Sequence, residues 1–275
     1  MLILLVSSAL SLALFVVIEN EVQYPLIDLR VLASWPFVNS LLLISVLVVG
    51  LFSVSFYLPQ FLQNGQGLTA LNAGELLLPQ ALVLAVLMPL AGRIYDQFGP
   101  RWPALIGLAV NAYGTYLLTN LNVDMTRQDV IVWTIVRAFG TGLALIPIMT
   151  NGLNALPPTL TGYGSAVNNI AQRVASSLGV AGLGALVSVE TAQANADYGA
   201  LIQTGRSVPG LQQQINTGSP TILGLYRDVQ LHAMSTAYDD VLLVTAALSA
   251  ACIPLALVLK RPTTNGGANV SAAIE

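Results

Sequence analysis

The sequence has 275 residues, of which 55% are hydrophobic and only 8% are charged, and its mean hydropathy is +0.73. Soluble domains carry about a quarter charged residues, so this composition excludes a soluble globular protein. The net charge of −3 is small and scattered, and the absence of a basic stripe argues against nucleic acid as a partner. The single cysteine, Cys252, lies in an apolar run, which excludes a disulfide framework and a cysteine-based metal site.

The apolar residues fall into runs of about 18 to 25, the length that a helix needs to cross the hydrocarbon core. They predict an all-α polytopic membrane protein with about seven transmembrane helices. Polar links separate the runs at 19–36 and 60–72, a long outer loop is expected at about 190–238, and the tail 261–275 is expected to be disordered. The predicted spans lie at about 1–18, 37–58, 76–93, 102–121, 130–153, 163–189 and 241–259.

Arginine and lysine near the span ends indicate the orientation, because cytoplasmic loops carry an excess of them. A cytoplasmic C-terminus gives the better count, and Met1 then starts on the outer side without a charged leader. That start suggests an upstream half that is absent from this chain. In this orientation Arg30, Arg93, Arg101, Lys260 and Arg261 lie inside, whereas Arg127, Arg206 and Arg227 lie outside.

The short link 92–101 between the third and fourth spans carries the densest local signal. Gly99 and Pro100 force a turn, and Asp96 can accept from free amide groups at a helix N-terminus. Such a link could hold two packed units in one conformation and release them in another, through ion pairs that break. An ordinary positive-inside loop is the alternative. The candidate latch residues are Gly92, Arg93, Asp96, Gly99 and Arg101.

Two arginines lie within predicted spans, Arg137 in the fifth and Arg173 in the sixth. Charge at bilayer depth costs at least about 2.5 kcal/mol even on the mildest scale, so each should face protein or a water-filled cavity. Arg173 belongs to a polar stripe at helical spacing, which either lines a cavity or forms a structural hydrogen-bond network. Three glycines that follow it are expected to allow close helix packing. The stripe consists of Ser165, Asn169, Gln172, Arg173 and Ser176, and the glycines are Gly179, Gly182 and Gly184.

The link 92–101 resembles the cytoplasmic loop signature G-x-x-x-D-x-x-G-R-[RK] of the major facilitator superfamily. Pro100 stands where the family usually has its first basic residue, which weakens one possible ion pair. More specifically, the chain is similar to the C-terminal part of the fourteen-helix drug:H⁺ antiporter branch, the multidrug efflux pumps. This second resemblance is carried by Asp28-Leu29-Arg30, 57–63, Ala73-Gly74, Pro79, 89–93, Arg137, Gly140, Gly142, Pro157-Pro158, Gly164, Asn168, Arg173, Gly179, Gly184, His232-Ala233 and 238–240.

The resemblance implies the C-terminal half of a secondary efflux transporter, which exports drugs or other small amphiphilic molecules by proton antiport and alternating access. Residues 37–260 would form a six-helix domain of two three-helix repeats, and 1–36 a remnant linker helix with a cytoplasmic loop. The implied partners are the lipid bilayer of the bacterial inner membrane, a small-molecule substrate, protons, and an N-terminal half that carries the acidic residues. The cavity residues that it implies are Asn39, Tyr57, Gln80, Arg137, Asn168, Asn169 and Arg173.

Three other readings remain, of which a membrane enzyme and a retinal protein have less support. The sequence lacks the catalytic residues of a membrane enzyme, because the one histidine, His232, lies outside the spans and the motifs H-E-x-x-H and G-x-S-x-G are absent. A seven-helix retinal protein would need a lysine at mid-depth, and Lys260 lies at the end of the last span. A truncated or split fragment without activity of its own is compatible with the family resemblance. No cofactor or metal is expected.

Overall fold

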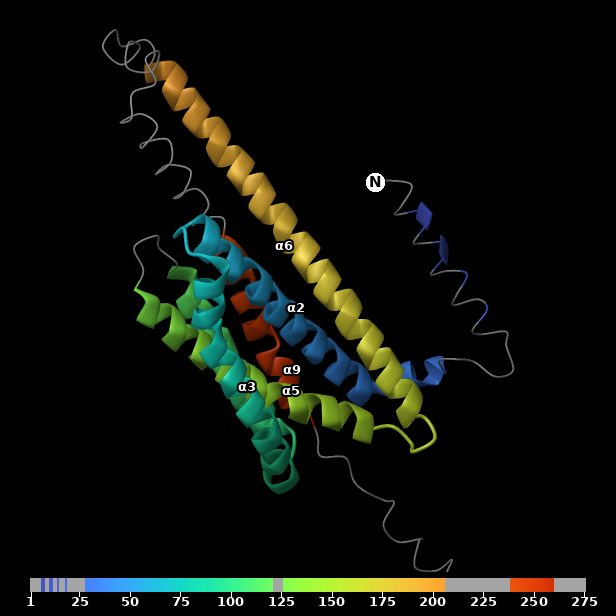
Figure 1. The fold of residues 1–275 in the computed structure, drawn as a ribbon. Coiled ribbons are helices and arrows are strands. Elements are labelled where there is room, and N and C mark those ends of the chain that lie inside the picture. The colour runs from blue at the N-terminus through green and yellow to red at the C-terminus, as the bar shows by residue number, and fades with distance from the viewer. Residues whose placement is uncertain are drawn as a thin grey trace, which may run out of the picture.

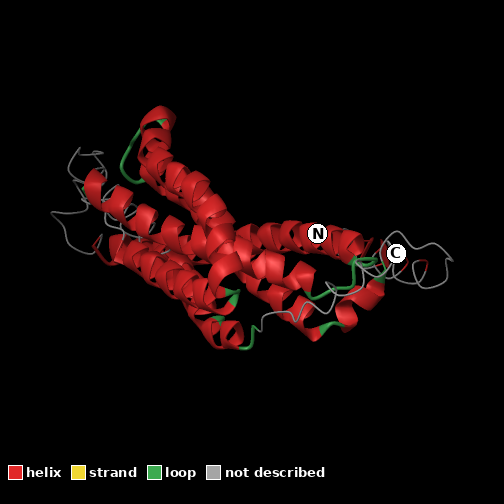
Figure 2. Cartoon of the chain, turned by 90° about the horizontal axis from the view of Figure 1, so that it is seen from below, coloured by secondary structure: helices red, strands yellow, loops and turns green. Residues whose placement is uncertain are grey.

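The computed structural model describes residues 28–120, 126–205 and 238–259, together with six single positions of the first predicted span, which are helical and exposed. Every regular element in these ranges is a helix (Figure 2). The remainder of the first span, the predicted loop from 206 to 237 and the tail lie outside the described residues. The expected all-α architecture is therefore confirmed.

Among the described residues, five helices are long and apolar enough to cross a membrane. A sixth, α4, has 17 residues, at the lower limit of about 17 to 25 for a spanning helix. Six helices thus stand at the predicted places from the second span to the seventh. They are α2 (Trp35–Asn64), α3 (Ala70–Phe98), α4 (Arg101–Leu117), α5 (Arg127–Asn154), the Thr161–Val189 part of α6 (Thr161–Gly205), and the span Tyr238–Leu257, which ends in α9 (Ile253–Leu257). The 3-10 helices η1 (Leu29–Ala33) and η2 (Leu118–Asn120) flank α2 and α4.

Residues of known turn chemistry set the helix ends. The Thr69 hydroxyl caps α3 by accepting from the Asn72 amide at 3.3 Å. Gly99 ends the same helix with φ at 79°, a left-handed conformation that favours glycine. Pro79 and Pro147 lie inside continuous helices. Membrane helices tolerate such prolines because neighbouring groups satisfy the freed carbonyls.

Successive helices run in opposite directions. The Asn154 side-chain amide donates to the Tyr95 hydroxyl at 3.1 Å, so α5 and α3 end on the same side. The Asn39 amide donates to the Leu255 carbonyl at 3.2 Å, so α2 begins where the last span ends. This alternation is the arrangement that consecutive membrane crossings require, and it agrees with a multi-pass protein.

The sixth helix is longer than predicted. The sequence analysis ended this span at Val189 and began a loop at 190, whereas α6 continues to Gly205. The stretch after Val189 contains four alanines, two glutamines and a glutamate, which are good helix formers even where the sequence becomes polar. Figure 1 shows α6 running beside α2 and extending beyond it. The membrane span itself ends at Val189, as predicted, and the helix continues into the segment that was expected to be a loop.

The closest helix packing is between α4 and α5, where glycines let the two backbones touch. A Cβ atom added at Gly140 would lie 2.2 Å from the Asn111 amide nitrogen, and one at Gly114 would lie 2.6 Å from the Arg137 amide nitrogen. The Asn111 side chain also donates to the Thr141 hydroxyl at 2.6 Å. Small residues and an interhelical hydrogen bond are what hold helices together when lipid surrounds them. This contact fixes the position of Arg137.

Candidate functional site

Arg137 lies in the interior of the bundle, in α5, and only 1% of it is exposed. Its Nη2 donates to the Gly50 carbonyl of α2 at 2.6 Å. Within the described ranges its Nε has no hydrogen-bond partner, and the guanidinium makes no ion pair there. The prediction that this arginine faces protein rather than lipid is consistent with its burial. Within the described residues the positive charge between the membrane-spanning helices thus has no negative partner. Burying such a charge costs free energy, and charges of this kind usually mark functional sites.

Neutral groups surround this arginine. A Cβ atom at Gly50 would lie 3.1 Å from the Thr245 methyl and 3.9 Å from Arg137 Nη2. Because glycine has no side chain, the guanidinium can lie close to the α2 backbone at this position. The Thr245 hydroxyl donates to the Val241 carbonyl one turn away. Three spans, α2, α5 and Tyr238–Leu257, therefore meet at this charge.

The two candidate residues of α2 are both buried, near opposite ends of that helix. Asn39 is 2% exposed. Its side-chain amide donates to the Leu255 carbonyl, while its Oδ1 has no hydrogen-bond partner among the described residues. Tyr57, 5% exposed, donates its hydroxyl to the Val180 carbonyl of α6. Its ring centroid lies 6.0 Å from that of Tyr238. Tyr57 therefore ties α2 to α6 rather than lining an open cavity in this conformation.

The candidate residues of α6 point in different directions. Asn168 is buried, with an Nδ2 that has no partner in the described part of the chain. Asn169 and Arg173 are exposed, and the Asn169 amide donates to Ser165 of its own helix at 3.1 Å. Gln80 of α3 is half-buried. The structure thus does not bring the seven predicted cavity residues into one site, because Asn169 and Arg173 are exposed on α6 while Asn168 is buried.

The three glycines of α6 also lie on different faces of the helix, so only some of them pack against a neighbouring helix. A Cβ atom at Gly179 would lie 2.7 Å from Val49, and one at Gly184 would lie 2.6 Å from the Tyr57 hydroxyl, whereas one at Gly182 would contact nothing within 4 Å. Close packing is confirmed for Gly179 and Gly184. It is wrong for Gly182, which lies on the open face of the helix.

Replacing Tyr57 by phenylalanine tests the tie between α2 and α6. The variant removes only the hydroxyl that holds Val180, and we expect it to lower the unfolding free energy by about 1 kcal/mol. The loss should appear as faster hydrogen exchange of the α6 amides near Val180. Tyr113→Phe, at a side chain that is 59% exposed, is the matched control. Equal exchange in the two variants would contradict the role of this hydroxyl.

The latch loop forms the turn that was predicted, and its charged side chains lie at the surface. Arg93, Asp96 and Arg101 are exposed, and a Cβ atom at Gly92 would meet nothing within 4 Å, so Gly92 does not serve close helix approach here. Gly99 donates its amide to the Tyr95 carbonyl at 2.8 Å and makes the turn. The loop is therefore accessible to a second structural unit.

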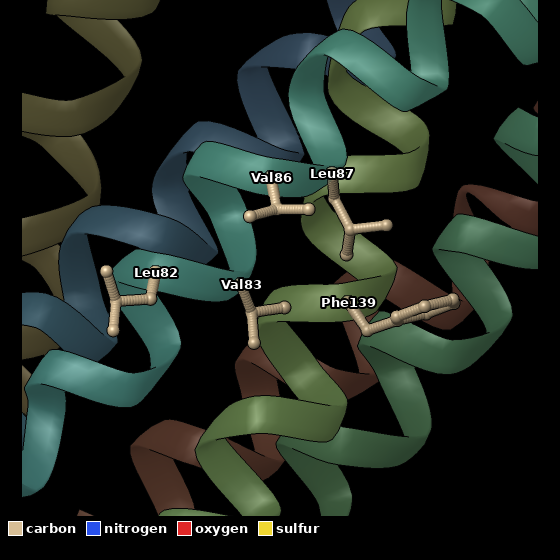
Figure 3. Close-up of a pocket in the computed structure, with 5 residues that line it drawn as sticks. All are labelled: Leu82, Val83, Val86, Leu87 and Phe139. Carbon is tan, nitrogen blue, oxygen red and sulfur yellow. The ribbon is translucent and has the colours of Figure 1, made fainter.

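Two surface hollows lie on the bundle, and both are apolar. The first, of about 390 Å³, is formed by α3 and Phe139 of α5 (Figure 3). The second, of about 350 Å³, lies beside the latch loop. Neither contains a candidate cavity residue, so they are the kind of surface that lipid covers. Their lining residues are Leu82, Val83, Val86, Leu87 and Phe139 for the first, and Ile94, Phe98, Trp102, Pro103, Ile106 and Leu143 for the second.

Several buried polar residues were missed by the sequence analysis. In the described part of the chain, Ser40 Oγ and both side-chain polar atoms of Asn151 are buried without a hydrogen-bond partner. Ser40 contacts the position of Gly152, where an added Cβ atom would lie 2.7 Å from its own Cβ. The signal available in the sequence was the pairing of asparagine with glycine at 151 and 152, inside an apolar span. Among the described residues no three histidine, cysteine, aspartate or glutamate side chains are placed to hold a metal ion.

Among the described residues, buried polar groups lie within a bundle of antiparallel helices that are long and apolar enough to cross a membrane, which is the architecture of a multi-pass membrane protein. The sequence matches the Major Facilitator Superfamily over residues 1–180. The chain belongs to this superfamily. Its fold agrees, with a TM-score of 0.63 at 16% identity to a bacterial homologue of the human lysosomal transporter Spinster in an inward-facing and occupied conformation, over 82% of this chain and 48% of that one.

Several curated relatives are transporters or resistance proteins. The chain is 37% identical to the uncharacterized MFS-type transporter YhcA of Bacillus subtilis over 62% of this chain and 32% of that protein. It is 33% identical to the lincomycin resistance protein LmrB of Listeria monocytogenes over 66% of this chain and 38% of that protein. It is 27% identical to the multidrug resistance protein Stp of Mycobacterium tuberculosis over 68% and 34% respectively. The chain thus spans well under half the length of these relatives.

Proposed function

We propose that this chain is the C-terminal half of an efflux transporter that exports drugs or other small amphiphilic molecules. The observation that carries the proposal is the set of buried polar side chains, above all Arg137, between α2, α5 and the last span of a bundle with the superfamily fold. The resistance names of LmrB and Stp support the class of cargo. Transport proceeds by alternating access and is driven by proton antiport.

A second helical half completes the transporter in this proposal. The chain covers 48% of the length of the Spinster homologue, and its described spans contain no carboxylate at mid-depth that could carry the coupled proton. The second half supplies those carboxylates, and the present chain has no transport activity by itself. The open face of α6, with Asn169 and Arg173 exposed, is where the second half and the substrate meet this one. Asn39, Tyr57, Gln80 and Asn168 then join the cavity as the helices rearrange.

The proposed orientation places the latch loop and the C-terminus in the cytoplasm of a bacterial cell, across the inner membrane. The positive-inside rule supports it, because Arg93 and Arg101 lie together at the end where α2 begins and the last span ends. Residues 37–260 form the six-helix domain. Asp96 and the exposed arginines then latch onto the second half from the cytoplasmic side.

Drug efflux from cells that co-express this chain with an N-terminal transporter half tests the proposal. We expect efflux only when both halves are present, and we expect Arg173→Ala to slow it by about tenfold, since the loss of one charged contact is worth about that factor. Arg127→Ala, which removes an exposed charge from the outer end of α5, is the control. Equal efflux by both variants at equal protein level would reject the role of the α6 stripe.

A further inference from the structure

The charge distribution of the described residues singles out Arg137. Every other described arginine is exposed, at positions 30, 93, 101, 127 and 173, whereas Arg137 is 1% exposed. Among the described residues its only acceptor is the Gly50 carbonyl, an uncharged group of a helix backbone. The bundle therefore buries one cation and surrounds it, in the described part of the chain, with groups that carry no negative charge.

The hydrogen-bonding capacity of this guanidinium is underused. It has five N–H donors and no acceptor. Nη2 donates to the Gly50 carbonyl, while Nε has no hydrogen-bond partner among the described residues. The Thr141 hydroxyl donates to the Arg137 carbonyl and the Thr245 hydroxyl donates to the Val241 carbonyl, and both are neutral groups that cannot compensate the charge. The group that would satisfy both the charge and the free donor is an anion, and a planar carboxylate matches the guanidinium fork with two parallel hydrogen bonds.

We propose that Arg137 binds the anionic group of an organic acid, so that the transported molecules include amphiphilic carboxylates. The inference rests on the proposed transport function and names a substrate class for it. Gly50 and Thr245 lie beside the guanidinium, since a Cβ atom added at Gly50 would lie 3.9 Å from Nη2 and 3.1 Å from the Thr245 methyl. The acid enters when α2 or the last span moves away from α5.

Trp133 lies one helical turn before Arg137, so its fluorescence can report ligand binding beside the guanidinium. The chain contains three tryptophans, so the Trp35→Phe and Trp102→Phe background leaves Trp133 as the single donor of fluorescence. The full chain is placed in phosphatidylcholine nanodiscs and titrated with pyrenebutyrate, whose pyrene accepts energy from tryptophan. Pyrenebutanol and pyrenebutylamine are the neutral and cationic probes of the same shape. We expect pyrenebutyrate to bind at least about tenfold more tightly than either.

The matched variants are Arg137→Gln and Arg127→Gln. Arg137→Gln should weaken pyrenebutyrate binding by at least about tenfold and leave pyrenebutanol unchanged, whereas Arg127→Gln should change neither. Circular dichroism confirms that each variant is helical, and Gly50→Leu provides a second test because it fills the space beside the guanidinium without removing the charge. Binding that is independent of probe charge, or unaffected by both Arg137→Gln and Gly50→Leu, would overturn the proposal.

Two further measurements show which kind of anion Arg137 binds. Raising the chloride concentration of the buffer is expected to leave pyrenebutyrate binding unchanged, and complete displacement by chloride would overturn the assignment to an organic acid. Addition of the N-terminal half is expected to preserve binding, and its loss would assign the site to a carboxylate of that half instead. Failure of efflux together with charge-selective binding would contradict the transport proposal alone, whereas efflux with charge-independent binding would contradict only this one.

Discussion

Gly140→Ala is expected to lower the unfolding free energy by about 3 kcal/mol or more, the upper range for overpacking. The added methyl carbon would lie 2.2 Å from the Asn111 amide nitrogen, 2.6 Å from the Gly107 carbonyl oxygen and 2.7 Å from the Asn111 Cα. All three are backbone atoms, so no side-chain rotation can relieve the clash. Helices α4 and α5 must move apart, and the Asn111–Thr141 hydrogen bond is then lost as well. Thermal unfolding in detergent, followed by circular dichroism, measures the effect.

Gly182→Ala is the matched control for this substitution. It adds the same methyl group to a membrane helix, but at a position with nothing within 4 Å. Alanine has the higher helix propensity, so we expect this variant to be at least as stable as the parent protein, with a gain of up to about 1 kcal/mol. If the two alanine variants melted at the same temperature, the close crossing of α4 and α5 would be refuted.

Arg137→Met is expected to increase stability by about 1 to 4 kcal/mol and to abolish efflux. Methionine fills a similar volume without a charge, and apolar replacement of buried charged groups often stabilises a protein by this amount. The gain should be clear here because the guanidinium makes no ion pair within the described ranges and donates to a single neutral carbonyl there. Equilibrium unfolding by denaturing detergent gives the stability, and the co-expression assay gives the efflux.

Arg127→Met serves as the control, because it removes an exposed arginine from the first turn of the same helix. Its stability should stay within about 0.5 kcal/mol of the parent, and its efflux should not change. A loss of several kcal/mol in Arg137→Met would show instead that the guanidinium is a net structural contributor. In that case the charge would be maintained for the fold and not for an anion.

The positions of the membrane helices could be predicted from the sequence because hydropathy depends on each residue alone. Spans from the second to the seventh stand where apolar runs predicted them, with ends that differ by a few residues at most places. The exception is α6, since helix propensity continued past the apolar region to Gly205. The latch turn was predictable for a local reason, namely that Gly99 needs a positive φ.

The relative rotation of the helices could not be predicted in the same way. Periodicity places Asn169 and Arg173 on one face of α6, but it does not show which neighbour that face meets, and both are exposed. The same limit applies to the glycines, of which Gly179 meets α2 while Gly182 meets nothing. For Arg137, burial could be argued from cost, but its acceptor on Gly50 is 87 residues away in sequence. Such partners depend on tertiary packing, which no local pattern encodes.

The α4–α5 crossing also has a consequence for the order in which the protein assembles during synthesis. Its partners, such as Gly107 with Ala144 and Asn111 with Gly140, come from consecutive helices, so a short connection closes the contact at small entropic cost. Chains leave the ribosome from the N-terminus, and this hairpin is complete once Asn154 has been made. The bond from Asn39 to Leu255 spans 216 residues and must form at the end. We expect a nascent chain stalled after α5 to hold a finished hairpin, beside an α2 that still awaits its last partner.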